Sequence, residues 1–377
     1  AANNTSSLTL TTFVVDTTAP TNQNTVFANS TSNTAGSSIT IVSSGTVTNQ
    51  VWFAPAGTEN FSAGATMTQA ASGTATSIAA PATEGTYYIY VIDEAGNVST
   101  ASTAALTVDN SSPSSFSTGV VTSVGGTVVA NYWNSTNTSI SVTVPIANDS
   151  SLTGGTIQLE ANVASGGFET FGSAYTIQGV DLNSSYAFTQ TATTFENLSG
   201  GLAESESVTF RAIITDLAGN STTGTTSSTT ISVDQTAPNA NYVTSTRVDG
   251  LYSTNDVLPI LIFLSDTATV TGNPQLTLET GDSDEVVDFT SGSGSSVIVF
   301  TYTVAAGNNS SDLDYSSTTA LALNGGAIND IAGNPFTLTL ATPGEANSLG
   351  ANKAIVVDTA APTNQDTVFA SSVVKQG

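Results

Sequence analysis

The sequence contains no cysteine and no histidine among its 377 residues. The absence of cysteine excludes thiol nucleophiles and disulfide bonds, and the absence of histidine removes the most common general base and transition-metal ligand. A glycine-rich phosphate loop followed by lysine is also missing. The acidic stretch 282–288 could supply paired carboxylates for glycoside cleavage, but it reads better as an acidic turn. We therefore expect a protein that is not an enzyme.

Basic residues are nearly absent. Only Arg211, Arg247, Lys353 and Lys375 oppose 29 acidic residues, which gives a net charge of -25. Such a chain repels the phosphates of nucleic acids and the surface of anionic membranes, but it attracts cations, divalent ones above all. No apolar run approaches the roughly 18 residues of a membrane span, and the N-terminal residues do not resemble a signal peptide. We expect neither nucleic-acid binding nor membrane insertion in this segment.

Low charge content and alternating hydrophobicity indicate a folded chain made of β-strands. Charged residues make up 9% and hydrophobic residues 39% of the sequence, so the chain can bury cores that a disordered protein lacks. Alternation of apolar and polar residues, with many β-branched side chains, predicts strands and hardly any helix. The clearest predicted strands cover 38–42, 86–92, 139–144, 207–214, 275–279 and 297–304. Short strands between Gly, Ser and Asn turns predict an all-β protein of β-sandwich type.

Two phrases recur along the chain. Val-Asp-x-x-x-Pro occurs at 15–20, 108–113, 233–238 and 357–362, and Asp-x-Ala-Gly-Asn precedes three of these copies at 93–97, 216–220 and 330–334. The segments 14–30 and 356–372 are nearly identical and lie 342 residues apart. This periodicity predicts a tandem array of similar modules.

The phrases also have predictable positions in each module. Asp at the start of a turn and Gly in a left-handed conformation favour a hairpin at Asp-x-Ala-Gly-Asn, and proline favours a stiff linker after the last strand. We predict domains at 17–109, 110–234 and 235–358, with an inserted hairpin near 164–173. Residues 1–16 are predicted to be the last strand of a preceding module or a donor strand, and residues 359–377 the first strand of a following module.

The paired phrases resemble the bacterial immunoglobulin-like repeats of large secreted surface proteins and adhesins. The likeness is most extensive in the third domain, in the stretches 249–281, 300–334 and 348–362, and elsewhere it is carried mainly by the phrases. It implies tandem immunoglobulin-like β-sandwich domains in an elongated array, on an extracellular protein at the cell surface. The fold alone does not identify a ligand.

Calcium is the cofactor that this composition favours, because Ca²⁺ prefers carboxylate, amide and carbonyl oxygens. We predict calcium sites where the turns meet the linkers, with ligands drawn from Asp16, Asp93, Asp109, Asp216, Asp234, Asp330 and Asp358. The alternative is that each turn aspartate only caps its own hairpin and each linker aspartate is solvated.

The function predicted is that of a non-enzymatic, extracellular structural or adhesive stalk stiffened by calcium at its domain junctions. Its partners would be copies of itself or adjoining repeats of the same chain, with a surface glycan or protein receptor as a further partner. One alternative is a self-assembling subunit of a filament, sheath or surface layer, in which strand 6–16 is donated to a neighbour. Another is a carbohydrate-binding module that uses the rings of Trp52 or Trp133, although core packing is the favoured interpretation of the aromatic residues.

Overall fold

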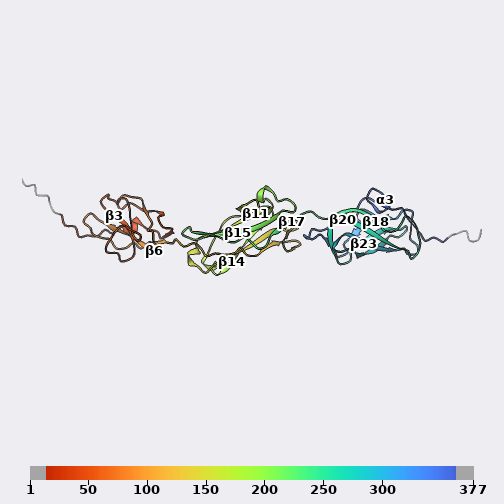
Figure 1. Cartoon of the computed structure of the whole chain (residues 1–377), viewed down its shortest axis with the longest axis horizontal. Coiled ribbons are helices and arrows are strands. Elements are labelled where there is room, and N and C mark those ends of the chain that lie inside the picture. Colours follow the sequence, from red (N-terminus) through yellow and green to blue (C-terminus); the bar gives the residue numbers. More distant parts are fainter. Residues whose placement is uncertain (1–13, 362–377) are drawn as a thin grey trace, which may run out of the picture. The chain divides into compact units, whose positions relative to one another are not determined.

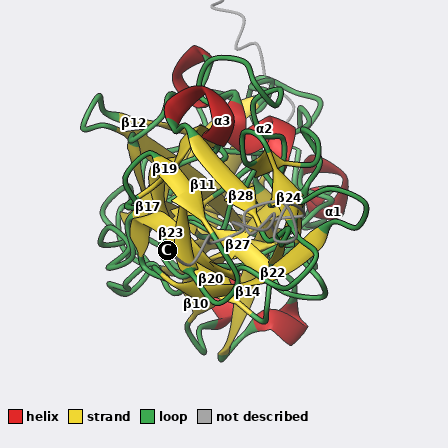
Figure 2. Cartoon of the chain, turned by 90° about the vertical axis from the view of Figure 1, so that its right-hand side faces the viewer, coloured by secondary structure: helices red, strands yellow, loops and turns green. Residues whose placement is uncertain are grey.

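The computed structural model describes residues 14–361, and it is an all-β protein. Its helices are single turns: α1 (Gln23–Val26), α2 (Ala192–Glu196), α3 (Leu349–Asn352) and the 3-10 turns η1 (Ser150–Leu152), η2 (Gly179–Asp181) and η3 (Leu198–Gly200). Strands dominate the view in Figure 2. Between residues 14 and 361, no helix is long and apolar enough to cross a membrane.

The described chain divides into two compact units. One takes in the described residues up to Val120 together with Val142–Phe188 and Thr209–Ser228, and the other takes in Val121–Ser141, Thr189–Val208 and the described residues from Thr229 onward. Each sheet nevertheless draws its strands from one of three sequence ranges, 31–108, 121–233 or 240–358, which we call the first, second and third strand groups (Figure 1). The domain limits expected from the sequence stay a prediction. So does the donor strand 6–16, most of which lies outside the described residues, as does nearly all of 359–377.

The first strand group contains a five-stranded sheet in the order β1-β7-β6-β3-β4 and a two-stranded sheet, β2-β5. Its core draws Phe53, Ile89 and Leu106 from the large sheet and Ile39 and Ile78 from the small one. The strands are β1 (Thr31–Asn33), β2 (Ser38–Thr40), β3 (Gln50–Ala54), β4 (Thr68–Gln69), β5 (Ser77–Ala79), β6 (Gly85–Ile92) and β7 (Ala105–Val108).

The second strand group forms sheets in the orders β14-β10-β8 and β12-β11-β15-β17-β9, with β13 and β16 beside β11 and β15. The strict alternation of buried residues in β10, β11 and β15 shows one face of each strand turned to the interior. Asn162 pairs with Phe168 across the turn 164–167, so a hairpin of β11 and β12 lies near the predicted stretch 164–173; that it is an insertion stays a prediction. The strands are β8 (Val121–Val124), β9 (Tyr132–Trp133), β10 (Ser139–Ile146), β11 (Thr156–Val163), β12 (Phe168–Thr170), β13 (Tyr175–Thr176), β14 (Ser184–Thr191), β15 (Ser207–Thr215), β16 (Ser221–Thr223) and β17 (Ile231–Val233).

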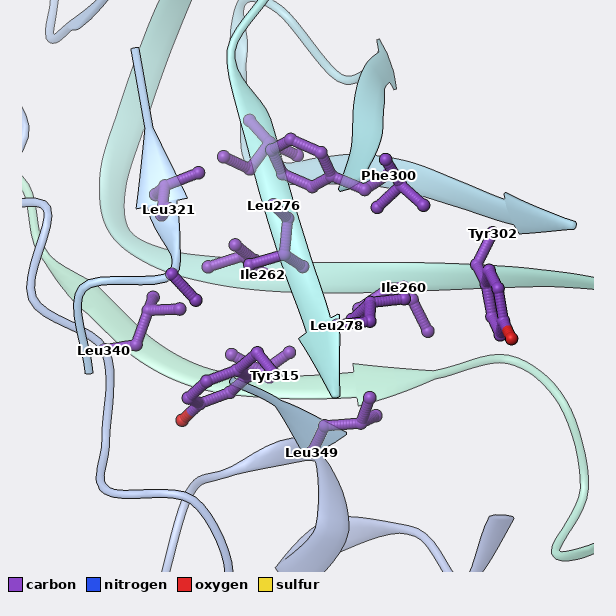
Figure 3. Packing of buried hydrophobic residues seen from close by; sticks show 14 of the residues in the cluster. Ile260, Ile262, Leu276, Leu278, Phe300, Tyr302, Tyr315, Leu321, Leu340 and Leu349 are labelled. Carbon is purple, nitrogen blue, oxygen red and sulfur yellow. The ribbon is translucent and has the colours of Figure 1, made fainter. Parts of the chain in front are cut away.

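The third strand group is built around β20, a 15-residue strand that lies between β18 and β23 in a large sheet. Ile262, Phe300 and Leu276 are fully buried in its core, which Figure 3 shows from close by. The strands are β18 (Ala240–Ser245), β19 (Gly250–Tyr252), β20 (Val257–Thr271), β21 (Gln275–Glu279), β22 (Glu285–Ser291), β23 (Ser295–Thr303), β24 (Asn309–Ser310), β25 (Asp314–Tyr315), β26 (Leu321–Ala322), β27 (Ala327–Asn329) and β28 (Ile355–Asp358).

The three strand groups end in the same way. In each group a short strand pairs in parallel with the last strand: β1 with β7, β9 with β17 and β19 with β28. The final register pairs are Asn33 with Val108, Trp133 with Val233 and Tyr252 with Val357. Each of these valines directly precedes the aspartate of a Val-Asp-x-x-x-Pro phrase, so the three phrases at 108–113, 233–238 and 357–362 begin at the exit of a last strand.

Candidate functional site

The Asp-x-Ala-Gly-Asn segments form the same tight turn three times. In the third copy, the backbone N–H of Asn334 donates to Asp330 Oδ1 at 2.8 Å, and the N–H of Asp330 donates to the carbonyl of Asn334 at 3.1 Å. The other two copies repeat both bonds. The glycines have φ values of 89°, 99° and 95°, the left-handed region that glycine tolerates best. The predicted hairpin turns, with the aspartate capping its own turn, are therefore confirmed.

The asparagine that ends each turn also binds the backbone carbonyl of an aspartate far away in the sequence, in the preceding Val-Asp-x-x-x-Pro phrase. Asn97 Nδ2 donates to the backbone carbonyl of Asp16 at 3.1 Å and to Asp93 Oδ2 at 3.0 Å. The equivalent bonds join Asn220 to Asp109 and Asp216 at 2.9 and 3.0 Å, and Asn334 to Asp234 and Asp330 at 2.9 Å each. We call this arrangement the amide clamp: one asparagine side chain holds the aspartate of its own turn and the aspartate of the preceding Val-Asp-x-x-x-Pro phrase.

The third clamp has an additional set of partners in the loop 134–137, which follows β9. The N–H and the hydroxyl of Ser135 donate to Asn334 Oδ1 at 2.8 and 2.7 Å, so both ends of the Asn334 amide are used. Asn134 Nδ2 donates to the carbonyl of Ala332 at 2.6 Å and to the carbonyl of Thr127 at 2.7 Å. Asn134 and Asn334 are both fully buried. A buried amide with every polar atom bonded stabilises one arrangement, because any displacement leaves it unsatisfied.

Close packing at the third turn makes its glycine a steric requirement as well as a conformational one. A Cβ atom on Gly333 would lie 2.9 Å from the methyl carbons of Thr127 and Val129 and 3.0 Å from Asn134 Nδ2. A Cβ atom on Gly96 or Gly219 would meet nothing within 4 Å. The first two turns therefore share the backbone of the third turn but not its close neighbours.

The surroundings of two clamp aspartates shift their pKa values in opposite directions. The side-chain hydrogen bond from Asn97 lowers the pKa of Asp93 from its ordinary value. Burial, with the nearby Asp330 carboxylate as the next cause, raises the pKa of Asp234. Glu204 and Asp266 act in the same direction. Negative charge thus gathers around Asp234, at the exit of the second strand group. No basic side chain of the described residues offsets this charge through an ion pair.

The structure brings six of the seven predicted calcium ligands together in pairs: Asp16 with Asp93, Asp109 with Asp216, and Asp234 with Asp330. Asp358 lies at the exit of β28, and its Oδ1 accepts from the N–H of Ala360 at 2.9 Å. Within residues 14–361, no three acidic side chains are grouped so that they could hold a metal ion by themselves. At the third pair, Asn334 Nδ2 lies 3.2 Å from Asp234 Oδ1 and 2.9 Å from Asp330 Oδ2, so two carboxylates converge on one amide.

Both tryptophans and several neighbouring aromatic residues pack in the interior. Trp52, Phe53, Tyr87 and Tyr90 are at most 5% exposed, and Trp133 is fully buried and lies 4.7 Å from the ring of Phe195. This confirms the core-packing interpretation and leaves neither tryptophan ring free to stack on a sugar. Two cavities of about 370 and 410 Å³ have no acidic or basic side chain among their lining residues, so none of the predicted site residues opens into them.

The functional residues that the sequence prediction missed are the three clamp asparagines and the loop 134–137. The prediction concentrated on the carboxylates, whereas the amide carries the contact. One signal was available, since asparagine ends all three turn phrases although neither the capping aspartate nor the glycine requires it there.

Comparison with known proteins gives a weak likeness to solved structures. No family model and no curated protein matches the chain. One similar solved structure is described as giving structural insight into host cell surface retention of a 1.5-MDa bacterial ice-binding adhesin. It is 14% identical, the match covers 77% of this chain and 89% of that chain, and the TM-score is 0.30. A likeness of this size supports no inference about function.

Proposed function

We propose that this chain is a segment of a non-enzymatic, extracellular structural or adhesive protein of the cell surface, built from immunoglobulin-like β-sandwiches. The amide clamp is the observation that carries the proposal. An asparagine side chain joins an Asp-x-Ala-Gly-Asn turn to the aspartate of the preceding Val-Asp-x-x-x-Pro phrase three times in one chain. A contact repeated three times between turns and the phrases that precede them suits a protein whose modules are structural rather than catalytic.

The composition of the chain agrees with this proposal. It has no cysteine or histidine, and its net charge of -25 disfavours nucleic acids and anionic membranes. Its polar surface is mainly Thr, Ser, Asn and Gly, which are uncharged and suit an extracellular repeat protein.

We also propose that calcium binds at the exit of the second strand group, where Asp234 and Asp330 converge. The charge gathered there favours a cation, because burial and then the neighbouring Asp330 carboxylate raise the pKa of Asp234 and a divalent ion would offset that repulsion. Water and the backbone carbonyl of Asp234 would have to complete the coordination, because the carboxylates come in a pair. Titration of the intact chain with Ca²⁺ tests this proposal, and the lack of any binding heat at millimolar Ca²⁺ would sink it.

The structural role is tested by comparing Asn220→Ala and Asn334→Ala with the exposed control Asn60→Ala. We expect the two clamp variants to make Asp109 and Asp234, with the residues that follow them, more accessible to proteases and to amide exchange, and the control to leave them unchanged. Equal protection in all three proteins would show that the clamps do not hold the exits.

The cellular location needs a separate measurement. An antibody against this chain should label intact, unpermeabilised cells that make the parent protein. Labelling that appears only after permeabilisation would contradict an extracellular role.

A further inference from the structure

The loop after β19 and the end of β28, in the third strand group, have the same arrangement as the loop after β9 and the end of β17, which bind Asn334. Trp133 pairs with Val233, and Tyr252 pairs with Val357, so the next residues, Asn134 and Ser253, occupy equivalent positions. By the same register, Thr254 is equivalent to Ser135, and Asp358 is equivalent to Asp234. Ser135 donates to the oxygen of the Asn334 amide, and the Asp234 carbonyl accepts from its nitrogen.

The two loops have the same local geometry. In the second strand group, the N–H of Asn134 donates to Asn137 Oδ1 at 2.9 Å, and the N–H of Asn137 donates to the carbonyl of Asn134 at 3.1 Å. In the third group, the N–H of Ser253 donates to Asp256 Oδ2 at 2.8 Å, and the N–H of Asp256 donates to the carbonyl of Ser253 at 3.0 Å. The loop 253–256 is therefore already folded into the shape that the loop 134–137 has in contact with Asn334.

The strand exits match as well. Asp358 Oδ1 accepts from the N–H two residues later, as do the Oδ1 atoms of Asp16, Asp109 and Asp234. The same small turn therefore follows the aspartate in all four phrases. In each of the other three phrases, the aspartate carbonyl accepts from a clamp asparagine.

The second position of the loop contacts an asparagine oxygen in both earlier strand groups. The N–H of Ser135 donates to Asn334 Oδ1 at 2.8 Å, and the N–H of the equivalent Ala35 donates to Asn110 Oδ1 at 2.7 Å. Thr254 is an exposed residue that has both the N–H and the hydroxyl of Ser135. At this position the third strand group, with Thr254, resembles the second, with Ser135. The first strand group has Ala35, which lacks a hydroxyl.

We propose that Thr254 and Asp358 form a receptor for the asparagine of an Asp-x-Ala-Gly-Asn turn on a further sandwich of this type. The Thr254 N–H and hydroxyl donate to the amide oxygen, and the Asp358 carbonyl accepts from the amide nitrogen. The occupant is a turn like 93–97, because the residues around Asp358 repeat those around Asp16, whose carbonyl accepts from Asn97. This inference rests on the amide clamp proposed above and adds a binding surface to it.

The receptor discriminates between side chains by hydrogen-bond chemistry. It presents a donor at Thr254 and an acceptor at Asp358, so it requires a planar group that accepts at one end and donates at the other. Asparagine meets this requirement. Aspartate has the same shape but cannot donate, and its charge would add to that of Asp358.

A tandem chain tests the proposal: residues 1–361 followed directly by residues 20–377 of a second copy, which preserves the phrase around Asp358. Amide hydrogen exchange at Thr254 is compared between the tandem and the single chain. We expect exchange at Thr254 to slow by about fivefold or more in the tandem, the effect of one hydrogen bond of ordinary strength. Changing Asn97 of the second copy by Asn97→Asp should restore fast exchange.

A second variant and an internal reference complete the experiment. Thr254→Ala in the first copy of the tandem removes the hydroxyl and keeps the N–H, so it should weaken the protection of that N–H. Because it leaves the second copy unchanged, it tests the receptor even if Asn97→Asp unfolds that copy. Ser135 in the same molecule is the reference, because its N–H is already bonded to Asn334. If Ser135 is protected and Thr254 exchanges alike in both chains, the receptor is refuted and the clamps stand. If Ser135 is also unprotected, the clamp and the receptor are both refuted.

Discussion

The primary amide of asparagine has a donor and an acceptor on one rigid plane, and the third clamp uses both. Asn334 Nδ2 donates to Asp234 and Asp330, and Asn334 Oδ1 accepts twice from Ser135. The side chain is fully buried, so none of these bonds can be replaced by water without opening the site. The strength of the third clamp therefore depends on the chemistry of one functional group.

The first prediction concerns that group. Asn334→Asp removes the donor and places a third carboxylate beside Asp234 and Asp330. We expect it to lower the free energy of unfolding by about 2–4 kcal/mol, because a buried charge is left among like charges. The same change at the partly exposed Asn97 should cost about 1 kcal/mol or less, since water solvates the new charge. Urea unfolding of both variants measures the difference, and equal effects would contradict the role of burial.

The second prediction separates backbone strain from contact at the turn glycines. Gly333→Ala and Gly96→Ala place a side chain on backbones of similar left-handed φ, so both should cost about 1 kcal/mol in strain. Only the Gly333 change also drives a methyl group into Thr127 and Val129, and we expect it to cost about 1–3 kcal/mol more. Thermal unfolding of the two variants provides the measurement. Equal losses of stability in the two variants would mean that the segment around Thr127 and Val129 moves aside without loss of free energy.

The third prediction concerns pH. The folded-state pKa of Asp234 is raised, so its contribution to stability is present below the ordinary carboxyl value of about 4 and is lost as pH rises through the folded pKa. Asp234→Asn keeps the side-chain oxygen and removes the charge. We expect this variant to be more stable than the parent at pH 7, by up to about 0.5 kcal/mol, and equal to it near pH 3.

Asp93 provides the contrast for this measurement. Its lowered pKa means that its contribution is present above the ordinary value and is lost in acid, as pH falls through the folded pKa. Stability of the parent followed by chemical unfolding from pH 7 to pH 3 should thus show opposing contributions from these two groups. A gain from Asp234→Asn that does not change with pH would refute the electrostatic explanation.

At the scale of elements, the strands follow from alternation and the turns from phrase chemistry. All six predicted strands are present, among them 207–214 within β15 and 275–279 as β21. Period-two patterns are reliable here because one face of each strand is buried. The short strands β9 and β19 were not predicted, since two or three residues carry no period.

The fourth prediction tests how strongly the third strand group depends on its core. Ile262 on β20 is fully buried, and Ile262→Ala should lower the free energy of unfolding by about 2–5 kcal/mol through lost burial and the cavity left behind. Val286 on β22 is 52% exposed, so Val286→Ala should change stability by no more than about 0.5 kcal/mol. A small loss at Ile262 would mean that the surrounding side chains collapse into the space.

The candidate site was only half predictable from the sequence. The repeated phrases located the aspartates and their turns, and in the structure Asn220 links Asp109 to Asp216 and Asn334 links Asp234 to Asp330. The bonds of Asn134 and Ser135 to the third turn join residues about 200 positions apart in the sequence. No local pattern encodes such a contact, because it depends on how the sheets place their loops.

At the scale of the whole molecule, the excess of negative charge is the dominant property. Self-repulsion of a chain with a net charge of -25 lowers the stability of the compact state and is screened by any salt. Site-bound calcium would act beyond such screening, because it would bind the folded state preferentially. The two effects can be separated by matching ionic strength.

The fifth prediction follows from that separation. We expect the melting temperature in 5 mM CaCl2 to exceed that in NaCl of equal ionic strength by a few degrees, and the excess to disappear in Asp330→Asn. Asp282→Asn, in the acidic stretch 282–288 and outside the Asp234–Asp330 pair, is the matched control and should keep the excess. A parent protein that melts at the same temperature in both salts has no site-bound calcium.

The span of the clamps has a consequence for the order in which the chain folds as it is made. Clamp asparagines lie 81, 111 and 100 residues after the carbonyls that they bind. During synthesis from the N-terminus, a strand exit therefore emerges long before the asparagine that will hold it. Each exit stays open until most of the following module has appeared, and its closure marks that module as complete. In a chain whose synthesis stalls midway through a module, the phrase aspartate that precedes this module would lack its clamp asparagine. Every earlier phrase aspartate would already be bound.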